Sequence, residues 1–569
     1  AVEQSVTDLQ GPGNVNVLGD MIVVLDENLN VVWTWDTFDN LDVRRKAVLN
    51  EKCGGIGGAC PVYFQSVQAN DWTHGNSISF TADGNLLYSA RHQDWLIKIS
   101  YDNGNGDGHI VWRLGKDGDF AAPAGSIDPW FSHQHDGNFD ASGKLVLPGG
   151  IDSHVHLSQP SGPGITMADD FASGTRSAAF GGNTMILPFA MQQKGESLRE
   201  VVKQYHAKAD GHCYVDVSFH LIIADASETV LGQELPALVN DGYTSFKVFM
   251  TYEGLALSDM EMLNVMSVAR ETGALVMVHA ENYDAIRFLT DRLERAGKTA
   301  PKYHATSRPI PVEREATHRA ISLSEIIDVP IMIVHVSNRE AMEEIKRAQQ
   351  RGLKIYGETC PQYLVLTEKD LEGLNMEGTK YVCSPPPRDA ASQQACWEGM
   401  IYGVFSLFSS DHCPFRYDDP HGKLAPKGRT SFRWVPNGIP GVETRLPILF
   451  SEGVSKGRIT LNDFVALSST NHAKTYGLYP KKGAIAVGSD ADIAIWDPER
   501  KVTISQSLMH GGCDYTPYEG IEVTGWPVST MVRGKFVVRE GVLVGEEGAG
   551  AYVAREKSPL AVPVGTGTI

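Results

Sequence analysis

The chain has 569 residues, of which 42% are hydrophobic and 21% charged, so it can build a large core and is not a disordered chain. Its 50 lysines and arginines against 69 aspartates and glutamates give a net charge of −19, which argues against nucleic acid or an anionic membrane as the main partner. No apolar run reaches the length of a membrane-spanning helix, the start AVEQSVTDLQ shows no secretory signal, and the 8 cysteines include no CxxC pair, so we expect a cytoplasmic protein without a membrane span.

Residues 1–140 are rich in Gly, Asn, Asp and Trp and predict short antiparallel strands. Apolar or alternating runs such as MIVVLD, VVWTWD, SISFTADGNLLYSA, WLIKISYD and HIVWRLG are separated by turn sequences such as DENLN and DNGNGDG. This spacing indicates an all-β segment, built either as propeller blades or as a sandwich.

Residues 141–455 alternate compact apolar segments with amphipathic stretches such as SLREVVKQYHAKA, DMEMLNVMSVARETG and NREAMEEIKRAQQRG. Buried strands that alternate with helices predict an α/β fold with a parallel sheet, and eight such units predict a (β/α)8 TIM barrel. Residues 456–569 predict a short helical stretch and a small β-sandwich region that ends in a tail. The eight apolar segments are KLVLPGGIDSHVHL, GNTMILPFA, VDVSFHLII, TSFKVFM, ALVMVHAEN, PIMIVHVSN, LKIYGETCPQ and GVFSLFSSDH.

Polar residues stand on these strands towards their C-terminal ends, where a TIM barrel holds its active site. His154 and His156 are two positions apart on the first strand and therefore share a face. Taken singly, each polar residue has an ordinary alternative, such as a satisfied core histidine, a lysine that reaches solvent or a helix N-cap at Asp411. Together they predict a metal site, because imidazole and carboxylate ligands suit zinc. The other members are Lys247 in the fourth segment, His279 in the fifth, His335 in the sixth and Asp411 in the eighth.

Lysine is the unusual member of this set. An ammonium group does not bind a cation, and burial beside metal ions would disfavour its charged form. A carbamate formed from Lys247 and carbon dioxide would solve this problem, since it is anionic and has two oxygens that can bridge two metal ions about 3.5–4 Å apart.

The six residues, with GIDSHVHL, SFKVFMTY, VHAEN, IVHVSN and SSDHCPF, resemble the amidohydrolase superfamily and, more closely, its dihydropyrimidinase and hydantoinase family. The stretches TSRPIPVEREA, GETCPQYL, SPPPRD, PNGIPGVETRLP and KGAIAVGSDADIAIWDP extend the resemblance over about residues 140 to 560. The resemblance implies a metal-dependent enzyme that opens dihydropyrimidine or hydantoin rings to N-carbamoyl amino acids. It also implies two zinc ions per chain and a homotetramer, which is common among relatives.

The same resemblance implies how the metal ions are held. His154 and His156, with Asp411, would bind the more buried ion, and His279 and His335 would bind the second. Carbamylated Lys247 would bridge the two ions, and a hydroxide between them would attack the ring amide carbonyl.

For the remaining chemistry the resemblance implies four residues. Asp411 would take the proton of the attacking water and deliver it to the leaving nitrogen, as general base and then acid. Tyr252 would stabilise the developing oxyanion. Ser384 and Asn437 would bind the imide edge of the substrate, largely through backbone groups. Loop packing is the ordinary alternative for Tyr252 and Asn437.

The N-terminal stretches DWTHGNSISFTADGNLLYSARHQDWLIKI, HIVWRLGKDGDF and WFSHQHDGNF resemble part of an arylsulfotransferase, whose fold is a β-propeller. This resemblance places His74, Arg91, and His133 or His135 near positions that bind and transfer a sulfuryl group, and a cationic arginine would suit a sulfate ester. A segment of about 140 residues is enough for two or three blades, whereas a propeller needs at least four. We therefore favour a packing module over residual aryl sulfotransferase activity.

Other functions on the same barrel are also considered. A non-catalytic dihydropyrimidinase-like interaction protein would have lost metal ligands, whereas all six are present here. Dihydroorotases and allantoinases are neighbouring hydrolases, but the spacing of Lys247 and Tyr252 and the SPPPRD and PNG stretches favour the dihydropyrimidinase group. The expected partner is thus a small cyclic amide, with no nucleic acid.

Overall fold

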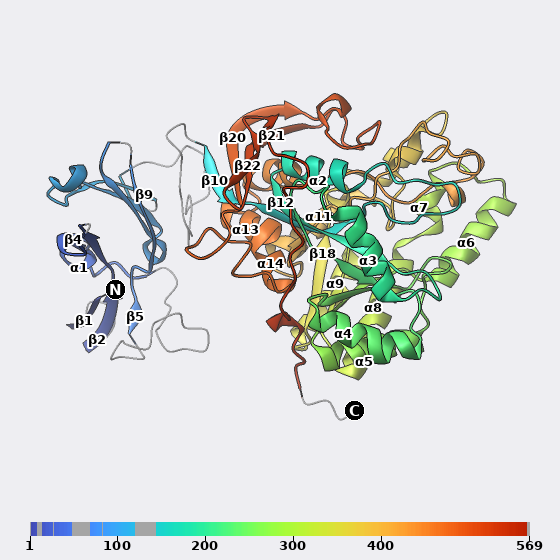
Figure 1. Cartoon of the computed structure of the whole chain (residues 1–569), viewed down its shortest axis with the longest axis horizontal. Helices are drawn as coiled ribbons and strands as arrows, with labels where there is room; N and C mark the ends of the chain where they lie inside the picture. The colour runs from blue at the N-terminus through green and yellow to red at the C-terminus, as the bar shows by residue number, and fades with distance from the viewer. Residues whose placement is uncertain are drawn as a thin grey trace. The chain divides into compact units, whose positions relative to one another are not determined.

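The computed structural model describes residues 2–7, 14–26, 28–47, 69–81, 83–115, 117–119 and 144–565. Two compact units divide the chain (Figure 1): one is Ala1–Val146 with Thr460–Asn462, and the other is Leu147–Ile459 with Asp463–Ile569. Within the described ranges, no helix is long and apolar enough to cross a membrane.

The larger unit is built on a parallel sheet of eight successive strands, which confirms the predicted α/β class and TIM barrel. A parallel bridge between Val155 and His412 joins the first strand to the chain that follows the last, so the sheet returns on itself. Each of the eight apolar segments of the sequence supplies one strand of this path. In order, the strands are β11 (Gly150–Val155), β12 (Asn183–Met191), β14 (His220–Ile222), β15 (Ser245–Phe249), β16 (Leu275–His279), β17 (Ile331–Ile333), β18 (Ile355–Thr359) and β19 (Leu407–Phe408), with β13 (Asp216–Val217) paired to β12 off the path.

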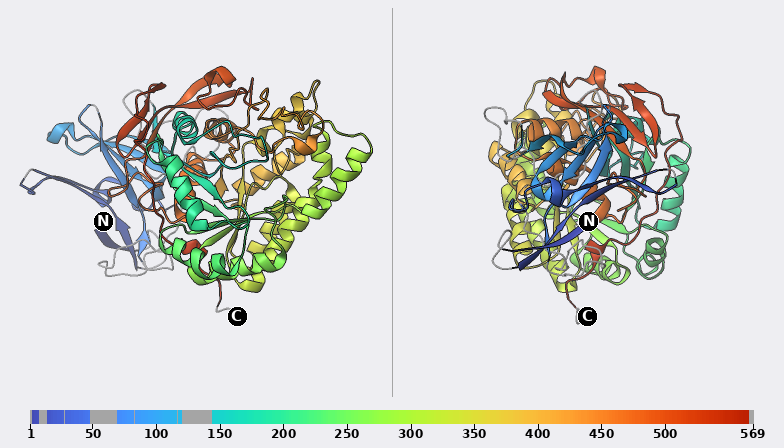
Figure 2. Two further views of the ribbon diagram at one scale, coloured as in Figure 1. Left: turned by 45° about the vertical axis from the view of Figure 1, so that its right-hand side comes forward. Right: turned by 90° about the vertical axis from the view of Figure 1, so that its left-hand side faces the viewer.

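Helices lie around the outside of these strands, as the left view of Figure 2 shows for the green and yellow part of the chain. The three amphipathic stretches of the sequence form α3, α5 and α9. In α5 the Ser258 side chain accepts from the Glu261 N–H, and the helix ends at Gly273, whose φ of 77° favours glycine. The helices are α2 (Phe171–Phe180), α3 (Leu198–Ala209), α4 (Leu235–Asn240), α5 (Asp259–Thr272), α6 (Tyr283–Arg295), α7 (Tyr303–Ser307), α8 (Ile310–Ile327), α9 (Arg339–Gln350), α10 (Gln362–Val365), α11 (Ala390–Ile401), α12 (Arg445–Leu449), α13 (Leu461–Val465) and α14 (Asn471–Thr475).

The interior of the barrel is filled by side chains from alternate positions of its strands. Full burial of each large apolar side chain stabilises the fold by roughly 1.5–3 kcal/mol, so this core fixes the strands against one another. Rigid strands in turn fix the direction of the polar residues at their C-terminal ends. The core side chains include Ile151, Met185, Leu187, Phe189, Ile222, Leu275, Met277, Met332, Val334 and Leu407.

The C-terminal strands form one sheet with β10 (Leu145–Pro148), in the order β10, β20 (Ile493–Thr503), β21 (Glu522–Val532), β22 (Lys535–Arg539) and β23 (Val542–Leu543). The stretch KGAIAVGSDADIAIWDP leads into this sheet. Its Lys482 is buried, and the ammonium lies 2.7 Å from an Asp216 oxygen, 2.9 Å from Asp490 and 2.6 Å from Asp492. These three carboxylates could suit a metal ion, but the lysine already supplies the cation they need.

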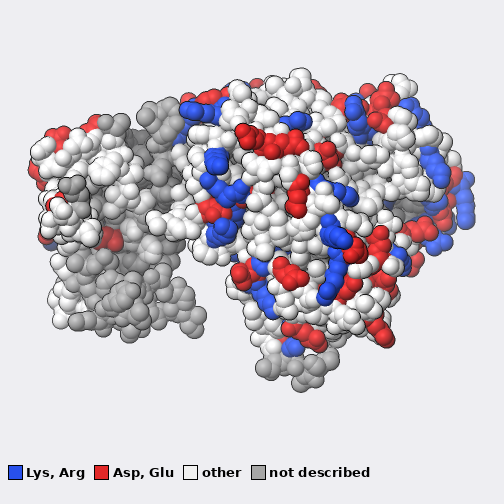
Figure 3. Space-filling view, in the orientation of Figure 1, with Lys and Arg blue, Asp and Glu red and all other residues white. Residues whose placement is uncertain are grey.

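Charged side chains of the larger unit are mixed rather than sorted by sign on the face drawn in Figure 3. On α9, for example, Arg347 lies 3.2 Å from Glu343 and 2.9 Å from Glu344. Such exposed pairs contribute little stability. On this face, the negative net charge of the chain does not gather into one patch of the larger unit.

The smaller unit contains three antiparallel or mixed sheets, in agreement with the predicted all-β segment. Its four-stranded sheet runs β6, β7, β8, β9, the strand number of a propeller blade. Two strands near the start, β1 and β2, were not predicted, because VEQSVT and NVNVLG hold few large apolar residues. The strands are β1 (Val2–Thr7), β2 (Asn14–Gly19), β3 (Met21–Leu25), β4 (Val31–Asp36), β5 (Asn70–Asp71), β6 (Gly75–Phe80), β7 (Leu86–Ala90), β8 (Trp95–Ile99) and β9 (Ile110–Gly115), with one short helix α1 (Thr37–Asn40).

Aromatic side chains dominate the core of the smaller unit. Trp72 is fully buried and stacks on Phe38 with ring centroids 5.3 Å apart. The indole of Trp35 donates to the Gly108 carbonyl at 2.8 Å and its ring meets Tyr88 edge-on. Each indole N–H therefore has a partner where it is buried, since that of Trp72 donates to the Arg45 carbonyl at 2.8 Å.

Candidate active site

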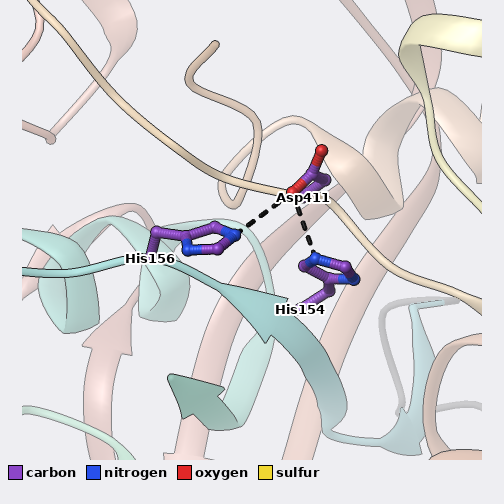
Figure 4. Close-up of side chains that lie close together, drawn as sticks. All are labelled: His154, His156 and Asp411. Carbon is purple, nitrogen blue, oxygen red and sulfur yellow. Dashed lines mark ion pairs between the residues drawn. The ribbon is translucent and has the colours of Figure 1, made fainter. Parts of the chain in front are cut away.

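Two histidines and one aspartate from opposite ends of the barrel sequence meet at the C-terminal end of β11. His154 lies on β11 and His156 directly after it, while Asp411 follows β19. Asp411 Oδ1 lies 3.2 Å from His154 Nε2 and 3.4 Å from His156 Nε2 (Figure 4). All three side chains are at least nine-tenths buried. One metal ion about 2.0–2.2 Å from each donor requires donors this close together.

The three other predicted ligands join this group through short contacts. Lys247 on β15 places its ammonium nitrogen 3.4 Å from His154 Nε2. His279 ends β16, and its Nδ1 lies 2.9 Å from Nε2 of His335, which follows β17. The rings of His335 and His154 have centroids 5.3 Å apart. The structure therefore brings all six predicted ligands to one place.

Side-chain oxygens on the far side of the first two imidazoles decide which ring nitrogens face this place. His154 Nδ1 lies 2.7 Å from Glu358 Oε1, and His156 Nδ1 lies 2.7 Å from Gln159 Oε1. An oxygen that holds one ring nitrogen fixes the tautomer and the orientation of the other, as in most protein metal sites. The donor set therefore fits a divalent metal ion, in agreement with the prediction.

In the second pair of histidines, His279 has the same support. His279 Nε2 lies 2.8 Å from Glu281 Oε2, which leaves Nδ1 to face His335. Two neutral imidazoles at this distance share a single proton between the facing nitrogens, whereas a metal ion would use both lone pairs. Nδ1 of His335 is buried without a hydrogen-bond partner among the described residues.

Burial sets the protonation of the site. Loss of water lowers the pKa of His154 and His335 well below the usual histidine value and also lowers that of His279, so these rings are neutral at pH 7. Burial also lowers the pKa of the Lys247 ammonium and raises that of the Glu358 carboxyl. Neutral imidazoles are the form that binds a metal ion.

Three residues of the site have a left-handed backbone. The φ angles are 43° at His335, 50° at Asp411 and 75° at Tyr252. Side chains other than glycine rarely adopt this conformation, and each instance costs on the order of 1–3 kcal/mol. At the ends of the strands, this left-handed conformation turns the chain sharply. Successive side chains there do not alternate between the interior and the outside of the barrel as they do along a strand.

The predicted substrate residues lie beside the second pair of histidines. The ring of Tyr252 meets that of His279 edge-on, with centroids 5.4 Å apart, and the Asn437 amide donates to the Tyr252 hydroxyl at 3.4 Å. Burial raises the pKa of Tyr252, so the phenol keeps its proton and can donate it to an acceptor. Ser384 is buried, and its side chain interacts with that of Tyr252.

A buried charge network supports this side of the site. Glu281 Oε1 lies 3.8 Å from Arg308 Nε, and the Arg308 carbonyl accepts from Arg388. Arg388 also pairs with Glu313 at 3.0 Å and donates to Ser337 Oγ at 3.0 Å. Arg308 and Glu313 come from TSRPIPVEREA, and Arg388 comes from SPPPRD. These stretches therefore tie the ends of β16 and β17 to the loop that contains Ser384.

Sequence reasoning missed the acidic partners Glu358 and Glu281, and also Gln159. A signal was available, because Glu358 stands at the end of the buried segment LKIYGETCPQ and Glu281 follows His279 by two positions in VHAEN. Both acids are fully buried. An acid inside an apolar strand end requires a partner, which here is a histidine of the site.

The predicted sulfuryl site of the smaller unit has little structural support. The ring of His74 lies tilted against that of His92, with centroids 4.6 Å apart. His133 and His135 lie outside the described residues, as does the side chain of Arg91. Sulfuryl transfer at these residues stays the alternative to the packing module that we favour.

Comparisons with known proteins agree with both resemblances. The sequence model of the amidohydrolase family matches residues 145–537, and that of the arylsulfotransferases (ASST) matches residues 1–146. A D-hydantoinase of Rhizobium radiobacter is 45% identical over 443 residues, which cover 78% of this chain and 94% of the relative.

Solved structures that resemble this chain come from the same group of enzymes. Dihydropyrimidinase from Brevibacillus agri NCHU1002 superposes with a TM-score of 0.73 at 41% identity, over 85% of this chain and 98% of that one. D-Hydantoinase from Bacillus sp. AR9 superposes with a TM-score of 0.72 at 46% identity, over 75% of this chain and 93% of that one. The chain therefore belongs to the amidohydrolase family and, as a hydrolase enzyme, groups with its D-hydantoinases and dihydropyrimidinases.

Proposed function

We propose that this protein hydrolyses cyclic amides and opens dihydropyrimidine and hydantoin rings to N-carbamoyl amino acids. One observation supports this most directly: four histidines, a lysine and an aspartate from five different barrel strands meet at the C-terminal end of the barrel. The relatives named D-hydantoinase and dihydropyrimidinase support the choice of substrate.

The proposed cofactor is a pair of zinc ions. His154, His156 and Asp411 would hold one ion, and His279 with His335 would hold the other. Lys247 would add its neutral amine to carbon dioxide and release a proton, which yields an anionic carbamate between the two ions. Bound zinc would supply a water acidic enough to attack at neutral pH and a positive charge that polarises the ring carbonyl.

The residues of the chain would divide the remaining work. Asp411 would accept the proton of the attacking water and pass it to the leaving ring nitrogen. The Tyr252 hydroxyl would donate a hydrogen bond to the carbonyl oxygen as its charge develops. Ser384 and Asn437 would bind the imide edge. The burial of Ser384 next to Tyr252, whose hydroxyl also accepts from the Asn437 amide, supports this role, because it brings the proposed substrate residues together.

Several further properties complete the proposal. The domain division is residues 1–140, 141–455 and 456–569, with the first part as a packing module. A homotetramer follows from the resemblance alone and a cytoplasmic location from the cysteine pattern and the absence of a visible signal sequence, and both stay predictions.

Metal content and hydrolysis of dihydrouracil, measured on the same purified sample, test the proposal. We expect about two zinc ions per chain and opening of the ring, as two-metal hydrolysis requires. Metal-loaded protein that opens neither dihydrouracil nor hydantoin would contradict the function.

A further inference from the structure

Two loops hold the proposed substrate residues of this site. Ser384 follows Val382 by two positions, and Asn437 follows Pro436 directly. The Gly438 N–H donates to the Val382 carbonyl at 3.0 Å, and Val382 and Val435 belong to the same small apolar cluster. A neutral hydrogen bond is weak and apolar packing is not directional, so neither fixes the distance between two loops tightly.

Lys423 adds a stronger connection at the same point. Its side chain is fully buried, and the ammonium donates to the Val382 carbonyl at 2.7 Å and to the Pro436 carbonyl at 2.7 Å. The two bonds are charge-assisted and short, which makes them stronger than bonds between neutral groups. One cation thus holds the backbone just before both substrate residues.

The segment that presents Lys423 is itself anchored. The Lys423 N–H donates to the Arg416 carbonyl at 2.8 Å, and the ammonium lies 5.9 Å from the centre of the Phe415 ring. Phe415 belongs to SSDHCPF, the segment that begins with the Asp411 region. Lys423 is therefore held by the same stretch of chain that contains Asp411, a proposed metal ligand.

A buried lysine in this position is costly for folding. Among the described residues, no carboxylate lies within ion-pair distance of the Lys423 ammonium, so only backbone carbonyls replace its water. Burial lowers its pKa to about 8, which still leaves most of the charge in place at pH 7. A methionine of similar length would avoid this cost but would take the donor away from the Val382 and Pro436 carbonyls, so the lysine serves to satisfy and connect these two points of the backbone.

We propose that Lys423 is a positioning residue for substrate binding: it sets the separation of the loops of Ser384 and Asn437 and so the width of the place that receives the imide edge of the ring. This inference rests on the proposed function. Lys423 lies behind the loops and does not touch the reacting atoms, so it acts on recognition of the ring rather than on proton transfer.

Steady-state hydrolysis of dihydrouracil by zinc-loaded full-length Lys423→Met tests the inference. We expect the KM to rise about tenfold or more while kcat falls less than about threefold, because loosened loops weaken binding without altering the reacting groups. The zinc content should equal that of the wild type. An unchanged KM, or a loss confined to kcat, would overturn the proposal.

Matched variants separate positioning from general damage. Lys427→Met removes an exposed lysine of the same loop and should leave both constants unchanged. Lys423→Arg, which keeps charge and donors, should show a KM closer to the wild type than Lys423→Met does. In an Asn437→Ala background, Lys423→Met should add little further increase in KM, since residues that act as a unit are not additive.

Two remaining outcomes are also decisive. If Lys423→Met does not accumulate as folded protein, Lys423→Gln, which keeps one amide donor, is judged by the same rise in KM. A wild-type protein that opens no ring overturns the proposed function and this inference with it. An active wild type with an unchanged KM in the variants overturns only the role of Lys423.

Discussion

The two units of this chain differ in where they place their buried polar groups. In the barrel unit, charged and ionisable side chains gather at the C-terminal ends of the strands, and His154, His156 and Asp411 form a group suited to a metal ion. Among the described residues of the N-terminal unit, no comparable group of ligands is found, and the core is formed by tryptophans and tyrosines. Each unit matches a different enzyme family, but within the described part of the chain only the barrel unit presents an assembled site, so its function is argued from the site and not from the resemblance alone.

The largest effect is expected at Asp411 in the barrel. Asp411→Ala should lower kcat/KM by about 10³-fold or more, because the substitution removes both a metal ligand and the proposed proton carrier. The measurement is dihydrouracil hydrolysis together with zinc content and a circular dichroism spectrum. Asp418→Ala, which removes an exposed acid of the same segment, is the control and should keep wild-type activity. A folded Asp411→Ala that retains turnover would show that the site works without its carboxylate.

The second largest effect is expected for loss of Lys247, the proposed bridging group. Lys247→Ala should reduce activity about 10²-fold or more, and acetate or propionate should restore part of it by supplying a carboxylate at the vacated place. The rate is measured with and without the added acid, and the wild type with the same acid is the control. Equal rates with and without the acid would argue against the carbamate.

A core substitution in the N-terminal unit tests whether hydrolysis in the barrel unit depends on that unit. Trp72→Ala should destabilise that unit by about 3–5 kcal/mol, as is usual for removal of a buried tryptophan, yet leave hydrolysis within about twofold, because no site residue lies there. Urea unfolding followed by fluorescence and hydrolysis assays gives both values. Val32→Ala, at an exposed position of the same unit, should change neither. A parallel loss of hydrolysis would show that the barrel depends on this unit.

The smallest effect is expected for sulfate chemistry. Since we propose that the N-terminal segment is a packing module, wild-type protein should transfer no sulfate from a phenyl sulfate donor, and Arg91→Ala should behave identically. Phenol release is the measurement. Transfer by the wild type that disappears in Arg91→Ala would contradict the interpretation of this unit as a packing module.

Much of the barrel could be predicted from the sequence because parallel strands are buried on both faces. GNTMILPFA and ALVMVHAEN are continuous apolar runs, and a polar residue at the end of such a run stands out. His154 and His156 could also be predicted to share a face, because they are two positions apart on a strand. In the N-terminal part, strands β3, β4 and β6 to β9 could be predicted, but not β1, β2 and β5 nor the pairing: β2 joins β5 across a long stretch of chain, and no local pattern signals that contact.

Two supporting contacts of the site could not be predicted, because each joins distant parts of the chain. His154 meets Glu358 across 204 positions, and Lys423 reaches Val382 across 41. A glutamate or lysine side chain is usually solvated, so residue type alone favours the wrong environment for both. Only the closed ring of strands brings these partners together.

The left-handed backbone at His335 and Asp411 has a consequence for how such an enzyme changes over time. Glycine would adopt these φ angles without a steric penalty, so a sequence selected for stability alone would drift towards it at both positions. The native residues persist against that tendency only while their side chains are needed. Stability and activity are thus opposed at these two strand ends, and a descendant freed from catalysis would be expected to relax there first.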